Sequence, residues 1–263
     1  MSLRRLLIII VILGTWEAVR RLDLVGPLLL ASPSEIVGAF VKSWPDYFLA
    51  LRFTIAEIVA ALALALPFGI GTGIVAGMAP FFGATAGPLL SSLFAVPLIT
   101  WYPLFMVWFG LGTMSKIVYA AVAGFFPIAI NTMNGIRGLD RRYLLFGQAI
   151  GCSRRQVVFR ILLPMAMPSI VSGLRIGTGL VVIGVIVAEM LASFGGIGYL
   201  ISYYRSIYAT DHVYLGILFA LACALAANWG LSLVERRFTH WRELQIGERL
   251  CRSDEEQQIR ARR

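Results

Sequence analysis

The chain has 263 residues, of which 59% are apolar and only 14% are charged, and its mean hydropathy is +0.80. Soluble domains have about half apolar and about a quarter charged residues, so this composition excludes an ordinary water-soluble globule and predicts lipid as the solvent. The net charge of +9 lies in loops and a tail without interleaved aromatic residues, which excludes a nucleic-acid partner.

The residues for catalysis or metal binding are few and far apart. Cys152, Cys223 and Cys251 show no metal-binding spacing, and His212 and His240 are distant from each other. The chain also has no GxxxxGK[ST] loop for ATP. We therefore expect no metal, no cofactor and no enzymatic activity, and we expect ATP hydrolysis in a separate subunit.

The N-terminus begins with two arginines and an apolar run, which resembles a secretory signal peptide. No clean cleavage site follows, so Leu6 to Val19 is predicted as a short first membrane helix, with a cleaved signal as the alternative. After it, Ser34 is predicted to cap a short amphipathic helix that lies at the outer membrane interface, preceded by Pro33.

Five further apolar stretches reach the length of about 20 residues that a bilayer core of about 30 Å requires. They are Phe53–Met78, Ala86–Phe109, Ile117–Asn134, Pro168–Ala192 and Val213–Val234. With the N-terminal segment, the prediction is an all-α integral membrane protein with six transmembrane helices.

Basic residues predict the orientation. With the N-terminus inside, sixteen Arg and Lys residues lie on the cytoplasmic side and six lie outside. The outer six are Arg20, Arg21, Lys42, Arg52, Lys116 and Arg205. Both termini are therefore predicted to be cytoplasmic, as is the loop between helices 4 and 5.

The third predicted span, Ala86–Phe109, contains Pro97 and Pro103 within seven residues. Because proline removes a backbone donor, a membrane helix broken by prolines needs water or protein beside it. The neighbouring Thr100, Trp101 and Tyr102 are therefore predicted to line a translocation path. Ordinary proline kinks in a bundle are the alternative.

The segment from Asp140 to Pro164 is the polar exception in this apolar chain. Its pattern predicts two short cytoplasmic helices separated by a turn at Gly151, with an apolar surface surrounded by Arg154 and Arg155. A partner protein with an acidic-edged groove fits such a surface. The alternative is a helix that lies on anionic lipid.

The spacing Gly151-x9-Ile161-x-Leu163-Pro164 resembles the cytoplasmic signature of permease subunits of bacterial binding-protein-dependent ABC importers. Further matches, in order, are similar to the nitrate, sulfonate and taurine branch. They are Pro97, Pro103-Leu104, Trp108-Phe109-Gly110, Gly112, Ser115-Lys116-Ile117, Gly173-Leu174-Arg175, Ala188-Glu189-Met190, Gly196-Ile197-Gly198-Tyr199-Leu200 and Glu235-Arg236-Arg237.

The resemblance implies an import permease in the bacterial cytoplasmic (inner) membrane. It implies a homodimer with two copies of a cytoplasmic ABC ATPase and a periplasmic or lipid-anchored substrate-binding protein. The solute would be a small organic or inorganic anion such as a sulfonate or nitrate. The implied parts are residues 1–50 with the first helix and the external segment, 51–240 as the transmembrane domain, and 241–263 as a cytoplasmic tail.

Within the transmembrane domain, the resemblance assigns residues 137–165 to an ATPase-docking coupling loop. The docking residues are Leu145, Phe146, Gly147, Gln148, Gly151, Ser153, Arg154, Arg155, Ile161, Leu163 and Pro164. The family usually has Glu-Ala-Ala where this chain has Leu145-Phe146-Gly147, so we expect a more apolar docking contact than in its relatives.

Ionisable residues within membrane spans predict functional sites, because a charge in lipid is costly. Arg175 and Glu189 are the candidates for the path. Arg175 either faces the axis and favours an anion or extends to the cytoplasmic interface. Glu189 either belongs to an outer gate or hydrogen-bonds the amides of the following glycine-rich turn. The role of Glu57 stays open.

Two other classes of protein compete with the importer. An ATP-independent channel or secondary carrier predicts repeats between the two halves or more charge within the membrane, and neither is evident. A polytopic membrane enzyme needs a cluster of polar catalytic residues at one membrane face, and the sequence has none.

Overall fold

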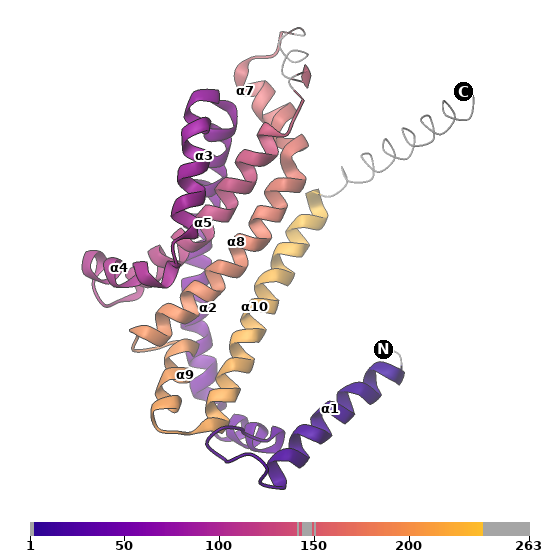
Figure 1. The fold of residues 1–263 in the computed structure, drawn as a ribbon, viewed down its shortest axis with the longest axis vertical. Coiled ribbons are helices and arrows are strands. Elements are labelled where there is room, and N and C mark those ends of the chain that lie inside the picture. Colours follow the sequence, from indigo (N-terminus) through magenta and orange to yellow (C-terminus); the bar gives the residue numbers. More distant parts are fainter. Residues whose placement is uncertain (1–2, 141, 144–148, 150, 239–263) are drawn as a thin grey trace.

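The structure, a computed structural model, describes residues 3–140, 142–143, 149 and 151–238, and all regular elements in these residues are helical (Figure 1). The α-helices are α1 (Leu3–Arg21), α2 (Pro33–Met78), α3 (Pro80–Ala95), α4 (Tyr102–Phe109), α5 (Thr113–Arg137), α7 (Arg154–Val157), α8 (Leu163–Leu191), α9 (Ile197–Ser206) and α10 (Thr210–Phe238). A 3₁₀-helix, η1 (Leu98–Trp101), precedes α4, and a π-helix, η2 (Val158–Leu162), precedes α8.

Within these described residues, four helices are long and apolar enough to cross a membrane, or five if one bent pair counts as a span. The predicted all-α membrane architecture is therefore confirmed. The sixth span and the orientation of the termini stay predictions.

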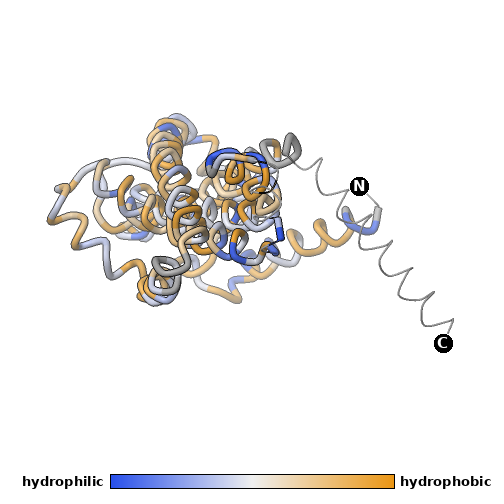
Figure 2. The backbone as a smooth tube through the Cα atoms, turned by 90° about the horizontal axis from the view of Figure 1, so that it is seen from above, coloured by the Kyte–Doolittle hydropathy of each residue, from blue (hydrophilic) through white to orange (hydrophobic). Residues whose placement is uncertain are grey.

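Helix α1 extends away from the bundle (Figure 1), and the hydrophobic residues along it are visible in Figure 2. The side chains from Leu7 to Leu13 are between 43% and 62% exposed, as expected for a helix surrounded by lipid. Hydrogen bonds join its C-terminal half to the residues around the start of α2. The Trp16 indole donates to the Ala31 carbonyl (2.9 Å), and the Ser34 hydroxyl donates to Glu17 (2.7 Å).

Helix α2 starts differently from the prediction. Ser32, not Ser34, is the N-cap: its hydroxyl accepts from the Glu35 amide (3.2 Å), and the Glu35 carboxylate accepts from the Ser32 amide (2.8 Å). Pro33 occupies the first helical position, where its missing N–H is not needed. The helix kinks at Ser43 and continues to Met78 as a span.

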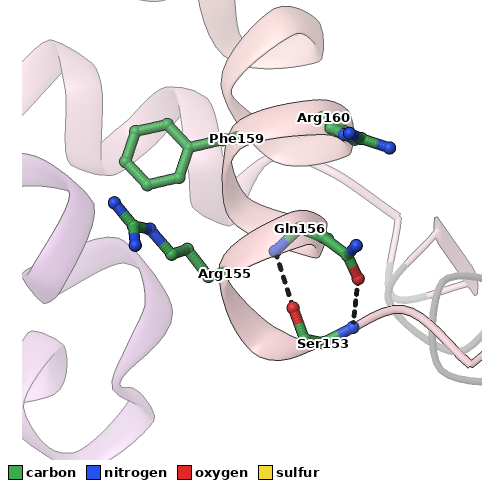
Figure 3. Close-up of a pocket in the computed structure, with 5 residues that line it drawn as sticks. All are labelled: Ser153, Arg155, Gln156, Phe159 and Arg160. Carbon is green, nitrogen blue, oxygen red and sulfur yellow. Dashed lines mark hydrogen bonds between the residues drawn. The ribbon is translucent and has the colours of Figure 1, made fainter.

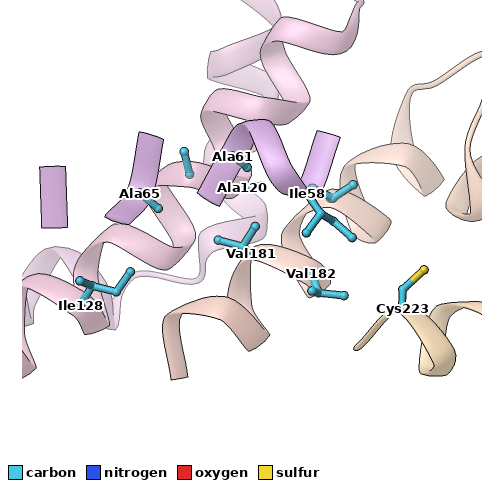
Figure 4. Close-up of a cluster of buried hydrophobic side chains, with 10 residues drawn as sticks. Ile58, Ala61, Ala65, Ala120, Ile128, Val181, Val182 and Cys223 are labelled. Atoms are coloured by element: carbon cyan, nitrogen blue, oxygen red, sulfur yellow. The ribbon is translucent and has the colours of Figure 1, made fainter. Parts of the chain in front are cut away.

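The core of the bundle is formed by α2, α5 and α8, which pack closely through small residues. A Cβ atom at Gly73 of α2 would lie 2.5 Å from the Cβ of Thr132 on α5, and one at Gly177 of α8 would lie 2.6 Å from the Ile128 side chain. Such contacts bring membrane helices to close distance, where van der Waals packing holds them. The central cluster, drawn in Figure 4, includes Ile58, Ala61, Ala65, Ala120, Ile128, Val181, Val182 and Cys223.

The predicted break in the third span is present. Residues Thr85–Ala95 and Leu98–Phe109 are bent by 88° relative to each other, with Val96 and Pro97 at the bend. Helix α4 consequently extends sideways from the bundle (Figure 1).

One continuous helix runs from Arg155 to Leu191, 37 residues, where the sequence predicts a separate helix up to Leu163 and a new span from Pro168. Pro164 has no N–H for the carbonyl of Arg160, and just before it the helix widens into the π-turn η2. The proline is therefore absorbed within the helix and does not end it.

Candidate functional site

The N-terminal end of the long α7–α8 helix belongs to the predicted docking segment. Gly151 has φ +77°, in the left-handed region that glycine adopts readily, so the chain can turn there. Ser153 and Gln156 then form a capping box, which was not predicted from the sequence. The Gln156 amide donates to the Ser153 hydroxyl (3.3 Å), and the Ser153 amide donates to the Gln156 side chain (2.8 Å).

The same segment carries a shallow pocket of about 300 Å³ lined by Ser153, Arg155, Gln156, Phe159 and Arg160 (Figure 3). The Arg155 guanidinium lies 6.0 Å from the centre of the Phe159 ring, and Phe159 is 58% exposed. The pocket therefore presents an apolar ring beside two cationic groups, which suits an acidic or aromatic surface of a partner.

The predicted Ile161-x-Leu163-Pro164 signature fastens this segment to the bundle. Leu162, between the signature residues, is 2% exposed and packs with Ile136 at the end of α5. Leu163 is half-buried against the same cluster. Leu145, Phe146, Gly147 and Gln148 lie outside the described residues, as does the side chain of Arg154.

The predicted path residues around the bend differ in exposure. Thr100 is exposed and its hydroxyl donates to the Pro97 carbonyl (2.7 Å), while Trp101 is half-buried. Tyr102 is fully buried, and its ring contacts the Tyr119 ring with centres 5.1 Å apart. Of these three residues, therefore, Thr100 is exposed and Trp101 is partly exposed in the single chain, whereas Tyr102 is not.

Arg175 and Glu189 both belong to α8 but are not brought together. Fourteen residues separate them, which is about 21 Å along a helix. Arg175 is exposed in the N-terminal half of α8, whereas Glu189, near the C-terminal end of α8, is 1% exposed.

Glu189 binds the turn that follows it. Its carboxylate accepts from the Gly198 amide (2.8 Å) and from the Thr54 hydroxyl of α2 (2.8 and 3.1 Å). The Thr54 hydroxyl also accepts from the Ile197 amide (2.9 Å). The structure thus supports the second reading of Glu189, a hydrogen bond to loop amides.

A buried ion pair lies beside this group. The Lys116 ammonium of α5 pairs with the Glu57 carboxylate of α2 and donates to the Ser193 hydroxyl (2.9 Å). Lys116 is 5% exposed and lies within the first turns of α5, so it belongs to the packed bundle and not to a solvent-exposed loop. Glu57 gains a role, while Thr54 and Ser193 were missed because small hydroxyl residues in apolar stretches give no sequence signal.

The fold defines a polytopic membrane protein in which a polar, arginine-bearing helical segment runs without interruption into a span. Residues 65–240 match the family described as "Binding-protein-dependent transport system inner membrane component". The chain belongs to this family of membrane permeases.

Two relatives illustrate the membership. The taurine transport system permease protein TauC of Escherichia coli is 32% identical over 238 residues, covering 88% of this chain and 86% of the relative. The putative aliphatic sulfonates transport permease protein SsuC of Bacillus subtilis is 33% identical over 242 residues, covering 91% of this chain and 88% of the relative. A solved structure of the MetNI methionine ABC transporter shares the fold, with a TM-score of 0.59 and 18% identity over 74% of this chain and 95% of that one.

Proposed function

We propose that a pair of these chains forms the translocation path of an ATP-driven importer for a small anion, a sulfonate or an inorganic oxyanion. The family match over residues 65–240 carries this proposal. Two relatives that align with about nine-tenths of the chain are named for taurine and aliphatic sulfonates, which supports an anionic solute.

The proposed topology has six spans with both termini in the cytoplasm of a bacterial cell and the chain in the inner membrane. Residues 1–50 supply α1 and the external segment, residues 51–240 the transmembrane domain, and residues 241–263 a cytoplasmic tail. The excess of basic residues at the inner end and the apolar surface of α1 support this arrangement.

The ATPase is proposed to bind the segment of residues 137–165, with two ATPase copies for the two permease chains. Three features support this contact: the glycine turn at Gly151, the capped start of α7, and the pocket beside Phe159. Because α7, η2 and α8 are continuous, a displacement at the pocket would move the whole of α8.

The path is proposed to run beside the bend between α3 and α4, where Thr100 and Trp101 are accessible. Irregular backbone at membrane depth is tolerated beside water or protein and not beside lipid. With four or five clear spans in the described residues, one chain is small for a closed path, which supports two copies. An external binding protein would deliver the solute.

Co-purification tests the ATPase contact. The tagged full chain is expressed together with an ABC ATPase from the same organism and purified in mild detergent. We expect the wild type to retain the ATPase and Gly151→Val to retain several-fold less, while the control Leu225→Ala on α10 retains it fully. A wild-type chain that retains no ATPase would contradict the proposal.

A further inference from the structure

The buried acidic and basic side chains among the described residues are three, and they gather at one place. They are Glu57 of α2 (3% exposed), Lys116 of α5 (5%) and Glu189 of α8 (1%). The Lys116 ammonium pairs with one oxygen of the Glu57 carboxylate. Glu189 is close enough to interact electrostatically with both of them. The three helices of the central bundle therefore meet around one charged cluster.

Hydrogen bonds show how the two carboxylates of the cluster come together. Thr54 lies one turn before Glu57 on α2, so both side chains project from the same face of that helix. The Thr54 hydroxyl lies 2.8 and 3.1 Å from the two oxygens of the Glu189 carboxylate. Lys116 reaches the same region, because it donates to Ser193 in the turn that follows α8. The two carboxylates therefore lie on one side of the α2–α8 contact.

The charges in this cluster do not balance. Two carboxylates and one ammonium leave one negative charge in excess. The other ionisable side chains packed here from described residues are Tyr102 of α4, Tyr119 of α5 and Cys223 of α10, and phenols and thiols are uncharged near neutral pH. Helix α9 contributes the backbone amides of Ile197 and Gly198, which carry no full charge. One positive charge is therefore missing from the buried cluster.

An unpartnered oxygen points to the same deficit. Oε1 of Glu57 pairs with Lys116, whereas Oε2 of Glu57 is buried and has no hydrogen-bond partner among the described residues. A buried ionised oxygen without a donor is costly, because it has lost its water and gained no partner. A proton removes that cost, since a carboxylic acid is neutral and its O–H can donate to the other carboxylate.

The surroundings of Glu189 admit a proton and not a metal ion. A Cβ atom at Gly196 would lie 2.1 Å from a Glu189 carboxylate oxygen, and one at Gly198 would lie 2.3 Å from the Ile186 carbonyl, so the space is filled. The amide and hydroxyl that face the carboxylate are donors, whereas a hard cation needs several oxygen acceptors. The described residues also contain no group of three His, Cys, Asp or Glu side chains that could hold a metal.

We propose that the cluster of Glu57, Lys116 and Glu189 binds one proton, held by the two carboxylates together, and that this proton keeps α9 tied to α2 and α8. The proton comes from water, and the protonated cluster is electrically neutral. When the proton leaves, two ionised carboxylates repel each other in a buried place. The bonds from Glu189 to Thr54 and Gly198 then weaken, so the turn between α8 and α9 is held less firmly as the pH rises. The proton site does not depend on which solute the chain carries.

The pH dependence of stability follows from the extra proton. Above the ordinary carboxyl range of about pH 4, the unfolded chain releases this proton while the folded chain retains it. Stability should therefore fall as the pH rises, until the folded chain also loses the proton. One proton changes the folding equilibrium tenfold per pH unit. For a chain of this size, that corresponds to about 3–5 °C per pH unit in the temperature at which half of the protein loses its folded gel-filtration peak.

Infrared spectroscopy of the purified full-length chain detects the proton directly, through the C=O band of a buried carboxylic acid. We expect the wild type to show this band near neutral pH and to lose it as the pH rises. Glu189→Gln and Glu57→Gln should each lack the band, because each leaves one carboxylate for one ammonium. The control is Asp23→Asn, which removes a carboxylate that is 81% exposed and should keep the band.

The thermal assay on the same proteins tests the role of the proton. We expect the wild type and Asp23→Asn to lose about 3–5 °C per pH unit above neutral pH, and the two glutamine variants to lose less than half as much. A wild type without the acid band would overturn the proposal, and this measurement needs no variant. Glutamine variants with the wild-type pH dependence would also overturn it. Stabilisation by sodium or potassium chloride, but not by choline chloride or by lower pH, would assign a metal cation in place of the proton.

Discussion

Two buried threonines offer a matched test of the hydrogen bonds that join Thr54 and Glu189 to the start of α9. Thr54 and Thr132 are both 0% exposed, and both lie on spans of the central bundle. The Thr54 hydroxyl bonds to the Glu189 carboxylate and the Ile197 amide, whereas the Thr132 hydroxyl has no partner among the described residues. Valine keeps the shape of threonine and removes only the hydroxyl group.

The two substitutions should therefore change the stability of the folded protein by different amounts or in opposite directions. In Thr54→Val, the buried amide of Ile197 is left unsatisfied, at about 1–3 kcal/mol, and a hydrogen bond to a carboxylate is lost, at about 1.5–3 kcal/mol. Because these terms overlap, we expect a loss of about 3 kcal/mol in stability. In Thr132→Val, removal of an unpaired buried hydroxyl should be neutral or stabilising by up to about 1 kcal/mol.

The assay is the temperature at which half of the detergent-solubilised protein loses its monodisperse gel-filtration peak, since unfolding of such a chain is expected to be irreversible. At about 2–4 °C per kcal/mol for a chain of this size, Thr54→Val should lower that temperature by about 6–12 °C. Thr132→Val should leave it unchanged or raise it. Equal losses in the two variants would refute the reasoning, because the hydrogen bonds would then have no specific effect.

Three further substitutions test other parts of the structure. Gly196→Ala should abolish uptake, because φ is +102° at this position and an added Cβ atom would lie 2.1 Å from a carboxylate oxygen of Glu189. The control Gly195→Ala should keep uptake near the wild-type level, because the nearest atom to its added Cβ lies at 3.9 Å. Gly151→Val should cost about 1–2 kcal/mol of local strain at φ +77° and uncouple ATP hydrolysis from uptake with normal insertion, as measured by the ratio of phosphate released to solute taken up. Gly73→Leu should separate α2 from α5 and reduce the yield of folded protein on gel filtration. Gly71→Leu should not, because the space around its Cβ position is open. Equal yields of the two variants would argue against the close packing of α2 and α5.

The sequence predicts the helical class and the break near Pro97 because both depend on local properties, namely apolar length and proline content. It misplaces the start of α2, because two serines flank Pro33 and only the reciprocal bonds with Glu35 distinguish them. It also misses the continuity of the helix through Pro164. A π-turn just before the proline lets the helix continue, and no local sequence pattern predicts such a turn.

The candidate site was harder to predict because it depends on contacts distant in the sequence. Lys116 has the sequence context of a cation at the edge of a span, and its burial follows only from packing against Glu57, 59 positions earlier. Thr54 and Glu189 are 135 residues apart. The motif from Gly151 to Pro164 did identify the family, because its residues lie in one continuous segment of the sequence and need no tertiary contact to be recognised.

The most direct test of the central claim is uptake of labelled taurine and nitrate into vesicles that contain the chain with its ATPase and binding protein. The account predicts accumulation of one of these anions that requires ATP and ceases when the ATPase is omitted or its catalytic residues are replaced. Uptake that persists without the ATPase would contradict the importer and favour a channel or carrier. No uptake of either anion by a complex whose ATPase is active would contradict the assigned solute class.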